Sequence, residues 1–261
     1  IHMKDMKDTV LNVSGVSKRF GGLQALSDVG ITIQRGQVYG LIGPNGAGKT
    51  TFFNVLTGLY TPDSGSFELA GKPYRPTAVH TVAKAGIART FQNIRLFAEM
   101  TALENVMVGR HIRTHSGLMG AIFRTAAFKA EEKAIADRAQ ELLDYVGIGK
   151  FAAYKARTLS YGDQRRLEIA RALATDPQLI ALDEPAAGMN ATEKVMLREL
   201  IDRIRQDNRT ILLIEHDVKL VMGLCDQLTV LDYGKQIAQG TPAEVQRNEK
   251  VIEAYLGTGA H

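Results

Sequence analysis

The stretch Gly43-Pro44-Asn45-Gly46-Ala47-Gly48-Lys49-Thr50 decides the fold of this chain. It matches a phosphate-binding loop, in which Gly, four residues, Gly, Lys and then Ser or Thr follow in fixed order. The apolar run Val38–Ile42 precedes it and reads as a buried strand, and the residues after it have the apolar spacing of a helix. The segment therefore predicts a strand, loop and helix unit that binds phosphate groups.

The residues of this loop have the chemistry that a nucleoside triphosphate needs. Gly46 and Gly48 allow a tight turn, so that backbone N–H groups point at phosphate oxygens beside the positive end of the following helix. Lys49 is expected to bridge the β- and γ-phosphates, and the Thr50 hydroxyl to complete a Mg²⁺ shell that the phosphates share. The alternative is a glycine-rich turn before an ordinary helix, which the strand and helix around the motif disfavour.

The composition is that of an ordinary globular protein. The 261 residues are 45% hydrophobic and 23% charged, enough for one large domain or one domain with a subdomain. The net charge of +4 comes from 32 basic residues interspersed with 28 acidic ones, which favours a solvated surface over a site for nucleic acid or for an anionic membrane face. Cys225 is the only cysteine, which excludes an internal disulfide and fits a reducing cytosol.

No stretch of the sequence approaches the roughly 20 apolar residues that a membrane-spanning helix needs. Apolar stretches are short and broken by charge, so we expect any membrane role to depend on a partner. The start lacks the apolar core of a signal peptide, and Ile1-His2 looks like a cloning remnant before a native start at Met3.

Polar side chains follow several apolar runs of the predicted sheet. The buried run Leu179–Leu182 ends in Asp183 and Glu184, of which one can hold Mg²⁺ while the other handles water. Gln92 directly follows a strand predicted at 86–91, and His216 stands just beyond a strand predicted at 210–214. Ligands bind at the carboxyl ends of such strands, so a catalytic site is expected there. The alternatives are a solvated strand end, a surface amide and a structural histidine.

The middle of the chain has a helical pattern. From 93 to about 157 it contains a capping box at Thr101–Glu104 and an apolar stripe within Lys129–Val146, which predicts an inserted helical subdomain. The apolar segment Gly117–Phe123 could pack locally or contact a partner. Ser160 then caps another helix, and with Gly162 and the free N–H groups it predicts a second anion site.

Phe20 stands between two predicted strands, Val10–Ser17 and Asp28–Gln34, beside the glycine turn Gly21-Gly22. Its ring could stack on a purine or could close the sheet edge as an apolar plug, and the sequence does not choose between them. Asn190, with Glu193 three residues on, is expected to cap a helix, and nearer the C-terminus a hairpin around Tyr233-Gly234 and a capping box at Thr241–Glu244 are expected.

Taken together, these motifs resemble the nucleotide-binding subunit of ATP-binding-cassette (ABC) transporters. The order and spacing of the loop, Gln92, Leu159–Gln164, Leu182–Glu184 and His216 match that family from Leu11 to Leu256. The serine-glycine signature separates the family from other phosphate-loop enzymes. Residues 89–92, 164–171 and 184–188 look like the branched-chain amino acid importers, and the stretch around 111–128 is similar to the larger of their two ATPase subunits.

The resemblance implies a fold and a role for each motif. The fold is one ABC ATPase domain of α/β class, with a phosphate-loop core and an antiparallel β subdomain at about 8–92 and 158–261, and an α-helical subdomain at about 93–157. It implies that Phe20 stacks on adenine, that Glu184 polarises the attacking water and that His216 contacts the γ-phosphate. The phosphates are implied to lie against Gly43, Pro44, Asn45, Gly46, Ala47, Gly48, Lys49, Thr50 and Thr51. Mg²⁺ is implied to be served, directly or through water, by Thr50, Gln92 and Asp183.

The resemblance also implies partners. Ser160 and Gly162 are expected to act on ATP bound to a second ATPase subunit, identical or different. The complex would include two membrane-spanning permease subunits, fed by a periplasmic binding protein, and would hold this chain at the cytoplasmic face of the membrane without nucleic acid. Ile94, Leu96 and Phe97 are expected to line a pocket for a permease helix, unless they pack only within the subdomain.

The implied function is ATP hydrolysis that powers a membrane importer for branched-chain amino acids. A soluble cassette ATPase of nucleic-acid repair or translation is the alternative, but those classes carry a long coiled coil or usually two cassettes. A small-molecule phosphotransferase would not need the signature.

The chain departs from the family pattern at two positions. These are Asp163, where the signature commonly has Gln, and Asn190, where many cassettes have Asp. Asp163 adds an acidic group near the predicted anion site and is expected to lower its affinity for phosphate, and Asn190 is expected to weaken the communication between the two sites.

Overall fold

The computed structural model describes residues 8–111 and 126–256 of the chain. The predicted apolar segment Gly117–Phe123 lies outside these residues. The chain forms two compact units, of which the first comprises Ile1–Arg89, Gln178–Ala187 and Lys194–His261 and the second comprises Thr90–Pro177 and Gly188–Glu193. No helix within 8–111 and 126–256 has the length and apolarity to cross a membrane.

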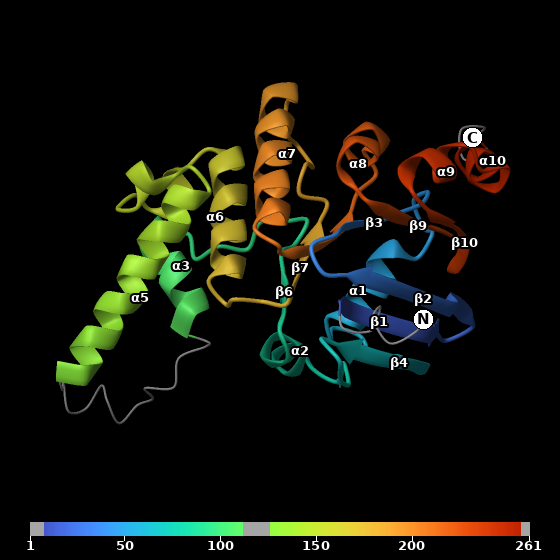
Figure 1. The fold of residues 1–261 in the computed structure, drawn as a ribbon, viewed down its shortest axis with the longest axis horizontal. Helices are drawn as coiled ribbons and strands as arrows, with labels where there is room; N and C mark the ends of the chain where they lie inside the picture. The colour runs from blue at the N-terminus through green and yellow to red at the C-terminus, as the bar shows by residue number, and fades with distance from the viewer. Residues whose placement is uncertain (1–7, 112–125, 257–261) are drawn as a thin grey trace. The chain divides into compact units, whose positions relative to one another are not determined.

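The first unit is built on a six-stranded, mainly parallel sheet (Figure 1). Its order is β10 (Lys235–Gly240), β9 (Gln227–Asp232), β3 (Val38–Ile42), β8 (Thr210–Ile214), β7 (Leu179–Asp183) and β6 (Ile87–Arg89). Every residue of β3, β7 and β8 is buried, as expected for parallel strands covered on both faces. Ile214 of β8 is in register with Leu41 of β3 and Asp183 of β7, so these three strands end within one residue of the same level.

A four-stranded antiparallel sheet completes this unit. Its order is β2 (Leu23–Gln34), β1 (Thr9–Phe20), β4 (Ser64–Leu69) and β5 (Lys72–Pro73). The two N-terminal strands run further than expected, because the turn between them uses only Gly21-Gly22 and pairs Phe20 with Leu23. The main apolar core takes side chains from both sheets and from helix α1 (Lys49–Leu56).

Helices cover the six-stranded sheet of the first unit. Figure 1 shows α1 on one side of this sheet, with α7 (Ala191–Gln206) and α8 (Val218–Leu224) on the other. The other helices that the structure describes in this unit are α2 (Val79–Ala85), α9 (Pro242–Gln246) and α10 (Glu249–Leu256). The helix starts expected at Asn190 and Thr241 are confirmed as reciprocal capping boxes.

The second unit consists mainly of α3 (Ala102–His111), α5 (Ala126–Tyr145) and α6 (Tyr161–Leu173), with short 3₁₀ helices at Gly149–Phe151 and Ala156–Thr158. Helix α3 packs against both α5 and α6 (Figure 1). The caps expected at Thr101 and Ser160 are confirmed, and the stripe of α5 is buried as expected. Whereas the sequence suggested a helical subdomain at 93–157, this unit also includes α6, because the buried face of α6 packs on α3 and α5.

One strand ends earlier than predicted. The expected strand at 86–91 is only Ile87–Arg89, so Gln92 does not follow the strand directly, which corrects the sequence prediction. The cause lies in the backbone of the next residues. The carbonyl oxygens of Phe91 and Gln92 accept hydrogen bonds from the Arg165 side chain, at 2.5 and 2.7 Å, instead of joining a strand ladder.

Candidate functional site

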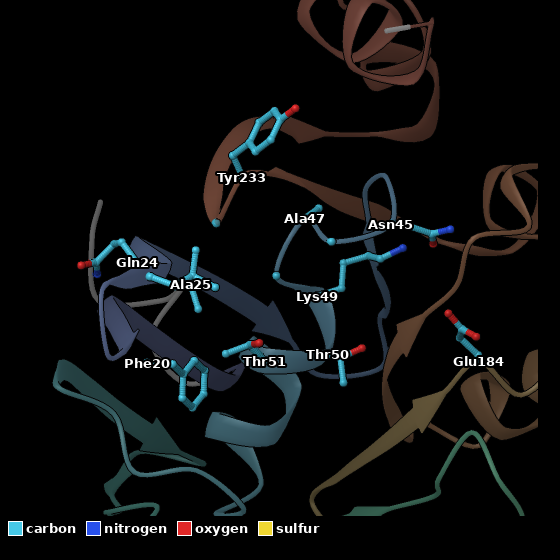
Figure 2. Close-up of a pocket in the computed structure, with 14 residues that line it drawn as sticks. Phe20, Gln24, Ala25, Asn45, Ala47, Lys49, Thr50, Thr51, Glu184 and Tyr233 are labelled. Atoms are coloured by element: carbon cyan, nitrogen blue, oxygen red, sulfur yellow. The ribbon is translucent and has the colours of Figure 1, made fainter. Parts of the chain in front are cut away.

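A cavity of about 370 Å³ opens in the first unit beside the phosphate loop. Figure 2 shows Glu184 on one side of it, Phe20, Gln24 and Tyr233 on the other, and Lys49 between them. The residues that line it are Phe20, Leu23, Gln24, Ala25, Asn45, Gly46, Ala47, Gly48, Lys49, Thr50, Thr51, Glu184, Tyr233 and Gly234. The predicted loop and the predicted water-activating carboxylate therefore face one space.

The backbone of the loop requires glycine at its two ends. A Cβ atom at Gly43 would lie 2.2 Å from the Leu231 carbonyl oxygen of β9, so a larger residue would push the loop off the sheet. Gly48 has a φ of 102°, which residues with side chains rarely adopt, and it is the N-cap of α1. The first N–H groups of α1 have no partner within the helix, so this turn directs donors and the positive helix end at the cavity.

Lys49 places a cation over this loop. Its ammonium donates to the Gly43 carbonyl oxygen at 2.6 Å, and the residue is only 6% exposed. Burial lowers the pKa of the Lys49 ammonium, while Glu184, Glu215 and Asp183 raise it in part. A buried cation among carboxylates at the mouth of an amide-lined loop is suited to a polyanion that brings further negative charge.

The residues present fit a Mg²⁺ ion by their chemistry. Thr50 is exposed at the cavity, and Asp183 ends β7 as a buried carboxylate. Hydroxyl and carboxylate oxygens, together with phosphate oxygens, are the ligands that Mg²⁺ prefers. Asp183 is held by Arg89, whose Nη2 lies 3.1 Å from Oδ2.

Arg89 was not predicted as a site residue. Its other terminal nitrogen donates to Asn54 Oδ1 at 2.7 Å and to Thr57 Oγ1 at 2.8 Å, and both residues belong to the region of α1. The guanidinium also stacks over Phe53, 4.7 Å from the ring centroid. Arg89 thus fixes the predicted magnesium ligand relative to the helix that begins in the phosphate loop. The only signal in the sequence is a charged residue within an apolar strand pattern.

The structure brings Glu184 and His216 together, and the sequence analysis had singled out each of them for the catalytic site. Glu184 Oε1 lies 3.3 Å from His216 Nδ1, and the glutamate side chain is 16% exposed whereas the histidine side chain is 60% exposed. Glu184 adopts a φ of 44°, which is unusual for a residue with a side chain, and its N–H donates to the Ile214 carbonyl oxygen at 2.9 Å. A carboxylate and an imidazole at this spacing can orient a water molecule and a phosphate oxygen.

A third carboxylate, Glu215, bonds the backbone next to Glu184 and His216 and was missed by the sequence analysis. It is 1% exposed. Burial raises its pKa, hydrogen bonds from the backbone of Ala186 and Asp217 lower it, and so does His216, whereas the charge of Glu184 raises it. Its position between an apolar strand and His216 was a signal that the sequence offered.

Phe20 forms the far wall of the cavity. The residue is 41% exposed, although its ring meets the Tyr60 ring edge-on at 5.2 Å between centroids. The Lys18 ammonium lies 5.2 Å from the Phe20 centroid. An apolar plug would be buried, so the exposure of this ring favours the alternative in which it offers its face to a planar base.

The remaining predicted site residues belong to the second unit. Ser160 is exposed and accepts the Asp163 N–H at 3.2 Å, with Gly162 in the first turn of α6. Asp163 lies in the first turn, where an acidic residue favours the helix start. Gln92 is exposed, and the Arg165 side chain of α6 donates to its carbonyl oxygen at 2.7 Å. The signature helix and the Gln92 segment are therefore bonded to each other.

Arg165 is the centre of this connection and is fully buried. It also pairs with Glu168 at 2.7 Å, and Glu168 in turn accepts the Arg95 N–H at 3.1 Å. We name the residues Arg165 and Glu168, with the backbone of 91, 92 and 95 that they bond, the α6 clamp. Neither residue was singled out from the sequence.

Comparisons with known proteins agree with this geometry. A family model described as ABC transporter matches residues 26–187, and one described as branched-chain amino acid ATP-binding cassette transporter matches residues 235–261. The chain is 46% identical to the high-affinity branched-chain amino acid transport ATP-binding protein BraF of Pseudomonas aeruginosa, over 97% of this chain and 99% of that protein. It is 45% identical to the corresponding protein LivG of Escherichia coli K12, with the same coverage.

A solved structure agrees as well. The ADP conformation of MJ1267, an ATP-binding cassette of an ABC transporter, matches with a TM-score of 0.83 at 32% identity, over 95% of this chain and 99% of that one. The fold class expected from the sequence is confirmed by this match. The family model covers more than half of the chain and the relatives cover nearly all of it, so the chain belongs to the ABC transporter family, as one of its ATP-hydrolysing cassettes.

Proposed function

We propose that this chain powers a membrane importer of branched-chain amino acids by hydrolysing ATP. The observation that carries the proposal is the similarity to BraF over nearly the full length of both chains, supported by the separate match of residues 235–261. These relatives are transport proteins, which favours this function over the repair or translation class.

The proposed chemistry uses residues that line or adjoin the cavity. Lys49 and the backbone of residues 43–51 bind the phosphates and neutralise their charge. Glu184 polarises the attacking water, while His216, 3.3 Å from its carboxylate, orients the γ-phosphate. Phe20 offers its face to adenine. Thr50 and Asp183, and Gln92 through water, would hold a Mg²⁺ ion, which would supply positive charge to the phosphate oxygens.

The site is completed by a second ATPase subunit in this proposal. Ser160 and Gly162 stand at the start of α6, where free N–H groups favour an anion. They bind the γ-phosphate of the ATP that the opposite subunit holds. ATP is then part of the dimer interface, and the dimer opens after hydrolysis. The free energy for transport comes from the difference in dimer stability before and after hydrolysis.

Two permease subunits are the proposed membrane partners, with a periplasmic binding protein that delivers the substrate. They hold this chain at the cytoplasmic face of the membrane. Ile94, Leu96 and Phe97 are proposed to contact a permease helix. Phe97 is 48% exposed, and the buried Asn105 holds its backbone by accepting the N–H at 2.9 Å and donating to the carbonyl oxygen at 3.1 Å. A fixed backbone that leaves an aromatic ring exposed is suited to docking.

Uptake by cells tests this function. Deletion of the gene in its host should lower the uptake of labelled leucine, isoleucine and valine, and the wild-type gene should restore it while Glu184→Gln should not. Uptake of a labelled sugar serves as the control. Normal uptake of the three amino acids in the deletion strain would contradict the substrate class. Restoration by Glu184→Gln would contradict a role for hydrolysis at this site.

A further inference from the structure

Glu215 is a buried carboxylate that joins the two strand ends carrying Glu184 and His216. It directly follows β8, the strand that lies between the phosphate-loop strand β3 and the Asp183 strand β7. Because the ends of these strands are in register, a side chain at this position reaches the backbone of the neighbouring segment.

The two oxygens of Glu215 bond two different segments. Oε1 accepts the N–H of Ala186 at 2.9 Å, in the turn that follows Glu184. Oε2 accepts the N–H groups of His216 at 3.3 Å and of Asp217 at 3.4 Å. All three donors are backbone groups, so this side chain acts on the positions of the two segments.

Both segments need such support. Glu184 has a left-handed backbone conformation, with a φ of 44°, which is unfavourable for a residue with a side chain and persists only where surrounding contacts impose it. The side chain of His216 is 60% exposed, so packing contributes little to its orientation and the backbone contributes most. A carboxylate that bonds the turn after Glu184 and the backbone of His216 sets the geometry between the two side chains.

We propose that Glu215 is a positioning residue, which holds Glu184 and His216 at their 3.3 Å separation during ATP hydrolysis by bonding the backbone of both segments. The inference rests on the proposed roles of Glu184 and His216. If Glu215 were only a structural residue of the core, its substitution would change stability and leave kcat unaltered. A positioning residue affects kcat, because a displacement of about 1 Å in a catalytic group costs about 100-fold in rate.

Steady-state hydrolysis of Mg-ATP by the purified full chain tests the proposal with Glu215→Gln and Glu215→Ala. Alanine leaves both segments unbonded and should lower kcat by about 10- to 100-fold with KM for ATP changed by less than about threefold. Glutamine keeps one acceptor oxygen and should retain more activity than alanine. Tyr39→Phe is the matched control, because it removes another buried hydrogen bond of the same sheet, to Thr229 at 2.6 Å. It should lower the melting temperature and leave kcat unchanged.

A double-mutant cycle with His216→Ala separates positioning from a general loss of structure. If Glu215 acts through His216 and Glu184, then Glu215→Gln should lower kcat much less in the His216→Ala background than in the wild type. Equal losses in both backgrounds, or a wild-type kcat in both Glu215 variants, would overturn the inference. If Glu184→Gln and His216→Ala themselves hydrolyse ATP at the wild-type rate, the proposed roles fail as well. Should Glu215→Ala not fold, the Glu215→Gln cycle decides alone.

Discussion

At the scale of single residues, Lys49 and Glu184 should separate binding from turnover. Lys49→Ala removes the buried cation over the loop and should weaken ATP binding by about 10- to 100-fold, as expected for a charged hydrogen bond. Glu184→Gln keeps a polar group of the same shape and should leave affinity within about threefold while lowering turnover by at least about 100-fold. Equilibrium binding of labelled ATP and phosphate release measure the two effects. Glu184→Gln losing as much affinity as Lys49→Ala would contradict the assignment.

The same residues show what the sequence can predict at this scale. The loop residues were predictable because they form one continuous run in the sequence, and because their chemistry depends on a single turn and a single helix start. Arg89 and Glu215 were not recognised, because the groups that they bond lie in distant segments of the chain. Arg89 bonds Asp183, which is 94 residues away, and Glu215 bonds Ala186, which is 29 residues away. No local pattern records such pairs.

At the scale of elements, the α6 clamp should make a large contribution to the stability of the second unit. Arg165→Met leaves Glu168 buried without its cation and should lower the free energy of unfolding by about 3–5 kcal/mol. The double variant Arg165→Met/Glu168→Leu removes both charges and should be less destabilised than the single variant. Urea unfolding measures both. Arg166→Met, one residue along and half-buried, is the control and should change stability by about 0.5 kcal/mol or less. A double variant at least as destabilised as Arg165→Met would refute coupling within the clamp.

Asn190 offers a second prediction at this scale, because it caps α7. Its Oδ1 accepts the Glu193 N–H at 2.9 Å, and Glu193 bonds the Asn190 N–H at 2.9 Å. Asn190→Ala should therefore lower the free energy of unfolding by about 1 kcal/mol. Asn190→Asp, which restores the residue that many cassettes have, keeps the cap and adds a negative charge at the helix start, worth about 0.3–1 kcal/mol. Thermal unfolding of the three proteins gives the order, and an aspartate variant less stable than alanine would contradict it.

Helix starts were predictable from the sequence, whereas the end of β6 was not. A capping box is a pattern of four residues, so those that begin at Thr101, Asn190 and Thr241 were found directly, and Ser160 was found as an N-cap serine. The strand at 86–91 ended early because the α6 clamp draws the carbonyl oxygens of Phe91 and Gln92 away from the sheet. That competition involves residues more than 70 positions apart. The sequence analysis also placed α6 with the core. Its buried face packs on α3 and α5, and no local pattern records contacts between such distant segments.

At the scale of the whole molecule, Cys225 should report on opening of the fold. Burial raises the pKa of its thiol to about 12 from 9.0, so the thiolate at pH 8 is about 1,000-fold scarcer than in a free cysteine. Alkylation by iodoacetamide should then follow unfolding. In Glu184→Gln, Mg-ATP at about 100 times Kd should raise the unfolding free energy by about 2.7 kcal/mol and slow labelling about 100-fold.

Lys49→Ala is the control for this labelling experiment, because ATP at the same concentration should slow its alkylation far less. A labelling rate that ATP does not change in Glu184→Gln would mean that Cys225 is reached through local opening at the end of α8, whose C-cap it is.

The substrate of transport belongs to this scale as well. No residue of the described site touches an amino acid in the proposed function, so that part of the assignment comes from similarity to relatives and not from the geometry.

Subunit association should depend on ATP. In the proposed dimer each γ-phosphate is bound by Ser160 and Gly162 of the opposite subunit, so the interface is incomplete without nucleotide and is lost after hydrolysis. Light scattering should find the wild type monomeric, and Glu184→Gln dimeric with Mg-ATP but monomeric with Mg-ADP. Lys49→Ala should remain monomeric with either nucleotide. If Glu184→Gln with Mg-ATP also stays monomeric at high concentration, homodimerisation is refuted. Dimerisation when a second ATPase from the same host is added would then identify a heterodimer, whereas its absence would place the weakness in Asp163 or Asn190.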